Sequence, residues 1–365
     1  MAKDLHITIV DYVGIKAGLD LYNDELATAL IDQSVHVKVL SNYRSKFGRK
    51  YFSNKFANSL GFFSWLFIGY VKSLIAIKIN SDVVIVHLFN PTILDSLFLK
   101  CIKRWRKKIV CILHDVESLT VANKENRNLE KCLNYSDHLV VHNNFTLKLT
   151  QQKYPHFAYK LVVIPHISFH DQRTIISKQD ARFKLSLPLD KDIILFFGMI
   201  KQSKGLDVLL LAMSNVDANL VIAGRLRNQI FNNYSEIIEK NNIADKVISD
   251  INYISNEKRD LYFKAADLIV LPYRKIYQSG VLILALSYEL PVVMSNLQPN
   301  IEFVEDSKCA VLFESEDSTD LADKVNSVLT DRIRLKDLIE QGKIKLARDH
   351  NPAIIAKSFL ELIER

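Results

Sequence analysis

The chain has 365 residues, more than one ordinary hydrophobic core accommodates, so we expect two domains of about 150–200 residues each. Apolar residues make up 48% of the chain and charged residues 24%, which is the balance of a globular protein and excludes a disordered or fibrous chain. The net charge of +7 would suit a nucleic acid, an anionic membrane face or phosphorylated substrates as partner. Because no nucleic-acid-binding motif accompanies that charge, we expect no nucleic acid and prefer the other two classes.

The start of the chain carries no predicted signal peptide. Lys3, Asp4 and His6 interrupt it, and the first apolar run, Ile7–Val10, has the length of a strand. The four cysteines show neither metal-ligand nor disulfide-framework spacing, so we interpret them as reduced thiols. These features predict a cytoplasmic protein, with a peripheral position on the inner face of the plasma membrane as the alternative.

A strand, a loop with two glycines, a helix and a second strand open the chain. The strands are predicted at 6–11 and 35–41, with an amphipathic helix between them at about 20–33. This order is typical of half of a doubly wound parallel sheet. The loop glycines, Gly14 and Gly18, do not fit the GxGxxG spacing, so no dinucleotide site is predicted.

Residues 60–79 are the most apolar part of the chain. The unbroken apolar run before Lys72 is 12 residues long, shorter than the roughly 18–20 residues that span a bilayer. A strand at 83–89, a helix at 91–103 and a basic run at 103–108 (KRWRKK) follow. Two interpretations stay open: a core helix with a solvated basic loop, or attachment to an anionic membrane surface.

Three further predicted strands end in histidine. They lie at 109–115, 137–144 and 161–167, and their ends carry His114-Asp115, His142 and His166. The carboxyl ends of parallel strands are where α/β proteins place their sites. No second ligand lies at metal-binding spacing, so we expect no metal site here. A polar stretch at 168–190 reads as an interdomain linker.

The second half of the chain is organised around residues 268–296. A buried strand at 268–271 leads through a polar loop to Ser279-Gly280, where a wholly apolar helix begins. Free backbone N–H groups and the positive end of the helix dipole meet at such a point, which suits a phosphate group. An ordinary strand–turn–helix crossover with a serine N-cap explains the same pattern equally well.

The pattern LPY…QSGVL…PVV in this segment resembles the donor-binding motif of GT-B glycosyltransferases of family four (glycosyltransferase group 1). Gly198, Lys204 and Gly205, after the predicted strand 193–198, stand where the family has its glycine and phosphate-binding lysine. NLQPNIEFV at 296–304 resembles a third family segment, with Glu302 at its acidic position. This chain departs from the family at Ile276 and Leu284, where members carry two glutamates, and at Met199, where they carry arginine.

The resemblance implies a GT-B architecture, α/β with two doubly wound (Rossmann-like) domains. The expected segments are an acceptor-binding domain at 1–170, a linker at 171–190, a nucleotide-sugar-binding domain at 191–350 and a crossover helix at 351–365. That last helix is expected to return to the first domain. Residues 1–160 resemble the family only weakly.

The resemblance also implies the site residues. His114 is the catalytic candidate that contacts the donor sugar or the acceptor, and Asp115 is the second catalytic candidate. Acceptor-binding candidates are Gly14, Gly18, Asp20 and His142. Donor-binding candidates are Gly198, Lys201, Lys204, Arg225, Tyr253, Ile254, Arg274, Gln278, Ser279, Gly280, Val281, Leu282 and Glu302, among which Lys201, Arg225 or Arg274 would replace the lost arginine charge.

The function implied is sugar transfer from a UDP- or GDP-sugar to a lipid-linked or oligosaccharide acceptor, in the synthesis of a surface polysaccharide or glycolipid. The resemblance implies a retaining reaction with no metal and no separate cofactor, in which the acceptor hydroxyl attacks from the face that the leaving group departs from. An inverting variant, with Asp115 or Asp20 as general base, stays open. So does a catalytically silent subunit that binds a partner transferase or a membrane lipid.

Overall fold

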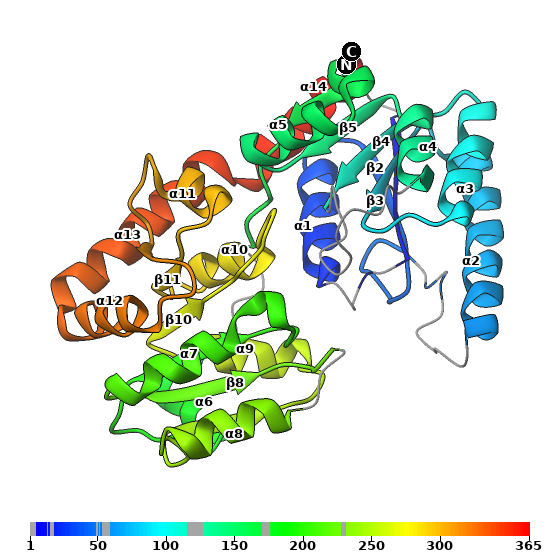
Figure 1. Ribbon diagram of the computed structural model, residues 1–365. Helices are drawn as coiled ribbons and strands as arrows, with labels where there is room; N and C mark the ends of the chain where they lie inside the picture. The colour runs from blue at the N-terminus through cyan, green and yellow to red at the C-terminus, as the bar shows by residue number, and fades with distance from the viewer. Residues whose placement is uncertain are drawn as a thin grey trace. The chain divides into compact units, whose positions relative to one another are not determined.

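The computed structural model describes residues 5–12, 14, 18–48, 50, 52, 59–114, 127–169, 176–227 and 231–365. The chain forms two compact units. Unit 1 comprises Met1–Phe169 and Asp349–Arg365, and unit 2 comprises His170–Arg348. Each unit has its own six-stranded parallel sheet with helices on both faces (Figure 1).

The sheet of unit 1 has the strand order β2-β1-β3-β4-β5-β6. β1 pairs with β3 through Ile7–Val10 and Val83–Val86. All of these residues are buried, as is typical of parallel strands covered on both faces. The strands are β1 (His6–Asp11), β2 (His36–Ser41), β3 (Val83–Leu88), β4 (Lys108–Leu113), β5 (His138–Val141) and β6 (Leu161–Val163). The helices are α1 (Leu19–Ile31), α2 (Ser59–Asn80), α3 (Ile93–Arg104), α4 (Arg127–Tyr135), α5 (Asn144–Lys153), η2 (Pro155–Lys160) and α14 (Pro352–Glu364).

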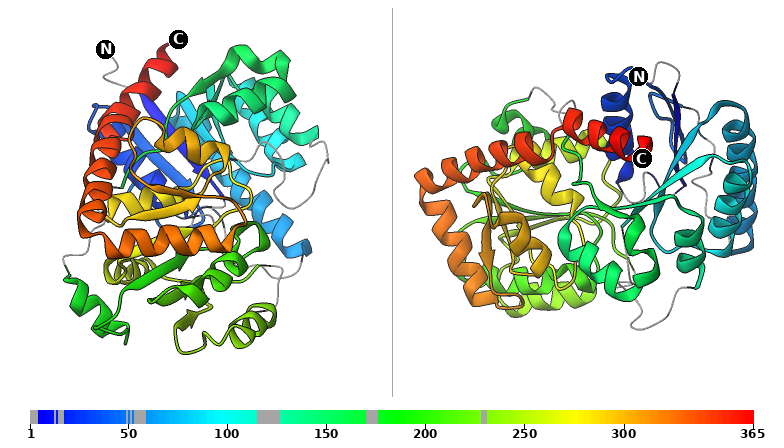
Figure 2. Two further views of the ribbon diagram at one scale, coloured as in Figure 1. Left: turned by 60° about the vertical axis from the view of Figure 1, so that its left-hand side comes forward. Right: turned by 90° about the horizontal axis from the view of Figure 1, so that it is seen from above.

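Helices α2, α3 and α4 cover one face of this sheet, where their apolar side chains share a core cluster with the strands (Figure 1). The last helix, α14, lies beside α1, as Figure 2 shows from above. Its carbonyl at Ile363 accepts a hydrogen bond of 2.5 Å from Lys108 Nζ at the start of β4. The expected return of the C-terminal helix to the first domain is confirmed.

The sheet of unit 2 has the order β12-β11-β10-β7-β8-β9. Its strands are β7 (Ile193–Phe197), β8 (Asn219–Ala223), β9 (Val247–Asp250), β10 (Leu268–Leu271), β11 (Val292–Ser295) and β12 (Val311–Phe313). Its helices are α6 (Lys178–Lys184), η3 (Gln202–Lys204), α7 (Leu206–Ala212), η4 (Met213–Asn215), α8 (Asn232–Lys240), α9 (Asn256–Ala265), α10 (Gly280–Ser287), α11 (Gln298–Val304), α12 (Ser318–Thr330) and α13 (Arg332–Asp349). The core of this unit packs α7 and α12 onto the central strands.

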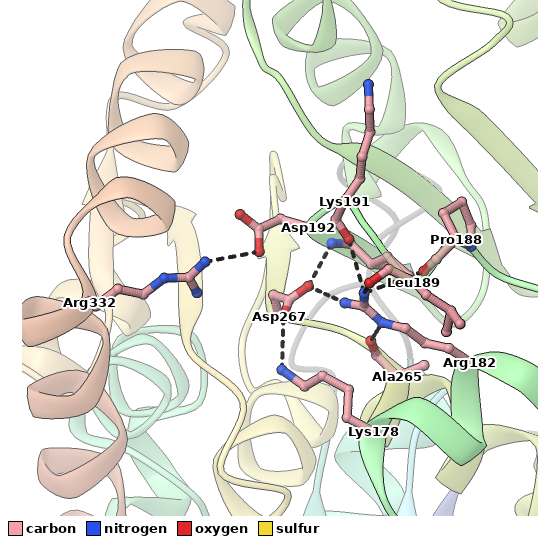
Figure 3. Close-up of polar contacts among 10 residues, drawn as sticks. Lys178, Arg182, Pro188, Leu189, Lys191, Asp192, Ala265, Asp267 and Arg332 are labelled. Carbon is pink, nitrogen blue, oxygen red and sulfur yellow. Dashed lines mark hydrogen bonds and ion pairs between the residues drawn. The ribbon is translucent and has the colours of Figure 1, made fainter.

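The segment predicted as a linker contains helix α6, which packs against α9 within unit 2. Arg182 on α6 is 5% exposed, and Figure 3 shows it pointing at Asp267, just before β10. Its guanidinium also donates to the carbonyl oxygens of Ala265 at 2.9 Å and Lys191 at 3.0 Å. Asp267 in turn accepts from the Ile193 amide at 2.7 Å and from Lys178 at 2.7 Å. These hydrogen bonds hold the polar segment that contains α6 against the starts of β7 and β10.

Among the residues that the structure describes, no helix combines the length and apolarity needed to cross a bilayer. The basic run predicted at 103–108 divides between two elements, since Lys103 and Arg104 end α3 and Lys108 begins β4.

Candidate functional site

The strand order of unit 2 places a topological switch point between β7 and β10. From β7 the chain moves to β8 and β9 on one side, and it then returns to β10 on the other side. The loops that follow β7 and β10 therefore leave the sheet in opposite directions, and ligands of open α/β sheets bind in the crevice between such loops. The first loop carries Gly198, Lys204 and Gly205, and the second runs from Pro272 to Ser279.

Helix α10 begins directly after the second loop. Ser279 is its N-cap, and its Oγ accepts a hydrogen bond of 3.2 Å from the Leu282 amide. Ser279 is buried, whereas Gly280 is exposed. The remaining first-turn N–H groups have no partner within the helix, and the helix dipole adds positive potential at that end. This geometry suits a phosphate, with Gly280 offering no side chain in the way.

Lys204 is held beside this loop by an aromatic ring. Its Nζ lies 3.4 Å from the ring centroid of Tyr273, which is 2% exposed. Burial raises the pKa of the Tyr273 hydroxyl, so the ring remains neutral. A cation over the face of a tyrosine ring is stabilised by about 0.5–2 kcal/mol. The ammonium of Lys204 is thereby positioned at the switch point.

Two glycines allow the strand ends to approach one another. Gly205 has φ +64°, and a Cβ there would lie 1.8 Å from the carbonyl oxygen of Pro272. A Cβ on Gly224, after β8, would lie 1.8 Å from the carbonyl oxygen of Gly198. Only glycine fits either position without moving backbone. The close packing of these three loops therefore requires glycine at both positions.

Arg274, one of the three candidates for the lost arginine charge, is paired with carboxylates of its own unit. Its guanidinium donates to both carboxylate oxygens of Asp207, at 2.8 and 2.7 Å, and also to Glu316 and to the carbonyl oxygen of Gln202. These carboxylates raise the pKa of Arg274, that of Asp207 first. Partial burial by itself would raise the pKa of Asp207, but the bonds from Arg274 hold it below its usual value. Arg274 is therefore a structural ion-pair partner.

A cation that our sequence analysis missed lies where the arginine charge is lost. Arg227 Nη1 is 3.7 Å from Met199 Sδ. A parallel bridge between Ile200 and Leu226 sets the two segments side by side. Arg225 in the same segment is exposed, and Lys201 is partly exposed. The only sequence signal for Arg227 is its place shortly after β8, which does not distinguish it from Arg225.

The remaining donor-binding candidates lie along the same edge of the sheet or on neighbouring helices. Tyr253, 54% exposed, and Ile254 follow β9. Gln278 and Val281 are partly exposed and flank the α10 N-terminus, Leu282 is buried inside it, and Glu302 is partly exposed on α11. Ile276 and Leu284, at the two glutamate positions of the resembled family, are both buried.

In unit 1, the histidines at the strand ends gather into one cluster. His87 is the penultimate residue of β3, His114 follows β4, and His142 and His166 follow β5 and β6. Ring centroids lie 5.1 Å apart for His87 and His114, 5.6 Å for His114 and His142, and 5.4 Å for His142 and His166. His114 is partly exposed and stacks on Phe89 with centroids 4.3 Å apart. It is the member of the cluster best placed to meet a substrate.

Burial favours the neutral form of all four imidazoles. Burial, the main cause, lowers the pKa of His87 to about 3 and that of His142 to about 4. The pKa values of His114 and His166 lie well below 6.5, also through burial first and through neighbouring histidines second. Across the described ranges, no three His, Cys, Asp or Glu side chains group as metal ligands.

The acceptor-binding candidates of unit 1 separate into two groups. Gly14, at φ +43°, and Gly18, the N-cap of α1, lie in the loop after β1, and Asp20 is buried in the first turn of α1. His142 is only 5% exposed and donates from Nδ1 to the Ile164 carbonyl at 2.8 Å. It packs within the cluster and is poorly placed to contact an acceptor. Asp115 lies outside the described residues.

Comparison with known proteins identifies the family that unit 2 matches. Residues 177–345 match the family model described as glycosyl transferases group 1. Unit 2 is a group 1 glycosyltransferase domain. The loops after β7 and β10 and the start of α10 lie inside the matched range, and the resemblance to this family is confirmed.

A curated relative of this chain is the GDP-mannose:glycolipid 4-beta-D-mannosyltransferase of Xanthomonas campestris pv. campestris. The two are 29% identical over 142 residues, which is 39% of this chain and 40% of that protein. The chain thus matches less than half the length of this relative.

Solved structures share the fold over nearly the whole chain. Sucrose-phosphate synthase from Thermosynechococcus elongatus superposes with a TM-score of 0.75 at 18% identity, covering 99% of this chain and 98% of that one. The Anabaena protein HepE, solved in complex with UDP-glucose, gives a TM-score of 0.76 at 15% identity, with 99% of each chain covered. These likenesses establish the GT-B fold for both units.

Proposed function

We propose that this protein is a glycosyltransferase that moves a sugar from a nucleoside diphosphate sugar to a saccharide acceptor. The observation that carries the proposal is the convergence of a capped helix N-terminus, at Ser279-Gly280, with Lys204 at the switch point of a group 1 glycosyltransferase domain. Backbone N–H donors and a fixed cation are what a diphosphate leaving group needs as its charge grows during transfer.

Within this proposal, the donor base is uracil or guanine. HepE was solved with UDP-glucose, and the Xanthomonas relative is named for GDP-mannose. The base would lie against Tyr253 and Ile254 at the end of β9. Arg227 and Arg225 join Lys204 in neutralising the diphosphate, while Arg274 remains bound to Asp207.

His114 is the residue of unit 1 that acts on the sugar or on the attacking hydroxyl. It is partly exposed, neutral and supported by the ring of Phe89. A neutral imidazole exchanges hydrogen bonds with a hydroxyl without placing a buried charge beside the sugar. The family resemblance favours a retaining transfer. In that scheme the acceptor hydroxyl attacks directly and no protein nucleophile is required.

A thermal-shift panel of UDP-, GDP-, ADP- and CMP-sugars tests the donor assignment. A ligand at 100 times its dissociation constant stabilises the folded protein by about 2.7 kcal/mol. We expect stabilisation by a UDP- or GDP-sugar and loss of that stabilisation in Lys204→Ala. Binding in the wild type without any transfer would favour the catalytically silent alternative. The apolar Ile276 and Leu284, which replace two glutamates of the family, are consistent with that alternative. Absence of binding by every nucleotide would refute the proposal.

We further propose that the acceptor is lipid-linked and that unit 1 contacts an anionic membrane surface. On α2, Phe67, Val71, Ile75 and Ile79 recur every four residues, which places them on one side of the helix. Their exposed fractions are 57%, 39%, 59% and 71%. Helix α3 lies alongside α2 and adds exposed Ile93 and Leu97, with a shallow apolar groove between the two helices.

Basic residues border this apolar face. Lys78 lies over the ring of Trp105, with Nζ 5.6 Å from its centroid, at the ends of α2 and α3. Exposed basic side chains in this part of the chain are Lys72, Lys78, Lys100, Lys103, Arg104 and Arg106. An apolar stripe with exposed cations on the same two helices suits the acyl–headgroup boundary of an anionic bilayer, and this complementarity supports a lipid surface as the occupant.

Flotation with liposomes of phosphatidylcholine, with and without phosphatidylserine, tests the surface. Each basic residue near an anionic membrane contributes about 1 kcal/mol, so neutralising Arg104 and Arg106 together should weaken binding about 30-fold. Ile75→Ser with Ile79→Ser should weaken it as well. Ile333→Ser, at an even more exposed apolar position on α13, is the control and should change nothing. Equal flotation of all variants would refute the assignment.

A further inference from the structure

A continuous chain of hydrogen bonds runs from Asp11 through Asn23 and His87 to His114. Asp11, at the end of β1, accepts from Asn23 Nδ2 at 2.7 Å and from the Gly14 amide at 2.8 Å. Asn23 Oδ1 lies 2.8 Å from His87 Nε2, and His87 Nδ1 lies 2.8 Å from His114 Nε2. The chain joins β1, α1, β3 and the end of β4.

The chemistry of each partner fixes the direction of every bond. The Asp11 carboxylate only accepts, so the amide NH₂ of Asn23 faces it and the amide oxygen faces His87. That oxygen also only accepts, so His87 carries its hydrogen on Nε2. A neutral His87 then has a bare Nδ1, which can only accept from His114. His114 must therefore carry its hydrogen on Nε2, leaving its own Nδ1 as an unprotonated acceptor.

Burial supports the neutral state on which this reasoning depends. Asp11, Asn23 and His87 are 1%, 0% and 2% exposed, so a proton added to His87 would place a positive charge deep in the unit. The groups that face His87 and His114 from neighbouring elements are the rings of Tyr22 on α1, Phe89 after β3 and His142 after β5. The pKa values of His87 and His142 are both lowered by burial, to about 3 and about 4.

We infer that Asp11, Asn23 and His87 are positioning residues that hold His114 in its Nε2–H form, so that Nδ1 accepts a hydrogen bond from a substrate hydroxyl. Within the described part of the chain, no group bonds to His114 Nδ1. Because an amide does not pass protons along the chain, the device orients His114 and sets its polarity without conducting a proton. The catalytic consequence rests on the proposed glycosyltransferase function, whereas the polarity of the hydrogen-bond chain does not.

Long-range ¹H–¹⁵N spectra of the full-length protein with labelled histidine test the polarity directly, because protonated and bare ring nitrogens resonate in separate regions. His87→Gln and His114→Gln assign the two signals. We expect both residues as Nε2–H forms at neutral pH in the wild type. An Nδ1–H form or an imidazolium at His114 would overturn the inference, whether or not the protein transfers sugar.

Asn23→Leu then tests the positioning role. It removes the acceptor that fixes His87, so the bond between the two histidines can reverse and the His114 signal should become a mixture of both forms. The rate of transfer should fall by roughly tenfold or more, with nucleotide affinity unchanged because the phosphate site lies in unit 2. Thr28→Val, which loses a backbone hydrogen bond on the same helix, is the control.

Two outcomes separate the inference from the proposed function. If the wild type shows the expected histidine forms but transfers no sugar, the inferred polarity of the hydrogen-bond chain is supported and the proposed function is refuted. If the wild type transfers sugar while Asn23→Leu keeps both the single His114 form and the full rate, the positioning role is refuted. A variant that does not fold leaves the wild-type spectrum as the decisive measurement.

Discussion

Replacing Arg182 by methionine should destabilise unit 2 strongly, since this residue links the start of β7 to the start of β10 (Figure 3). Methionine preserves most of the side-chain length and removes the charge and every donor. The Asp267 carboxylate, 8% exposed, would keep the Ile193 amide and Lys178 as partners but lose its buried cation. The carbonyl oxygens of Ala265 and Lys191 would lose a donor each.

Breaking a buried ion pair by removing one partner costs about 3–5 kcal/mol. We expect the lower end, about 3 kcal/mol, because Lys178 still pairs with Asp267 and its half-exposed ammonium can adjust. For a unit of this size, 1 kcal/mol shifts the midpoint of thermal unfolding by about 2–4 °C. The midpoint for unit 2 should therefore fall by about 6–12 °C.

Lys178→Met is the matched control, because it removes the second cation of the same carboxylate. Its side chain is 50% exposed, so the loss should be about 0–1 kcal/mol. Calorimetry gives the midpoints, and hydrogen exchange of peptides covering 176–200 assigns the change to this segment. Equal midpoints for the two variants, or exchange that accelerates only in unit 1, would refute the argument that the buried ion pair of Arg182 stabilises unit 2.

Two further predictions concern the site and the histidine cluster. Lys204→Ala should weaken nucleotide binding and lower turnover, whereas His114→Ala should keep nucleotide affinity and lower transfer alone. Titration with free nucleotide and single-turnover assays measure both, and normal nucleotide binding by Lys204→Ala would shift the phosphate contact to Arg225 or Arg227. Because His87 and His142 have lowered pKa values in the folded state, the unfolded chain binds more protons, and unit 1 should lose up to about 1.4 kcal/mol per histidine for each pH unit below 6.5. Calorimetry between pH 7 and pH 4.5 checks this, and His87→Gln with a reduced slope is the expected signature.

The elements that sequence patterns identified well are those with a strong local signal. The strand at 6–11 and the helix that begins at Gly280 were predicted at their observed positions, because apolar runs bounded by polar or glycine residues leave few alternatives. The helix predicted at 60–79 is α2, 59–80. Helix α6 was missed because its polar composition is typical of a linker, and only tertiary hydrogen bonds make a buried Arg182 stable.

In the candidate site, too, the sequence identified residues with a local signal and missed roles that depend on tertiary contacts. Lys204 and Ser279 lie in the loops that follow β7 and β10, so a motif and its spacing were enough to single them out. The roles of Arg274 and Arg227 depend on which partner each guanidinium reaches, and Asp207 lies 67 residues from Arg274 in the chain. The bond between Asn23 and His87 spans 64 residues. No local pattern reports such pairings, so the sequence alone showed neither the pairing of Arg274 with Asp207 nor the hydrogen-bond chain.

The placement of α14 beside α1 has a consequence for how the polypeptide matures during translation. Unit 1 is built from two separated stretches of chain, while unit 2 is one uninterrupted stretch between them. Because translation proceeds from the amino end, the first sheet can form early. The surface of α1 that α14 covers remains exposed until all of unit 2 has been synthesised. Completion of the first-made unit thus waits for the last-made helix, and a nascent chain halted within unit 2 would expose an apolar helix face to chaperones.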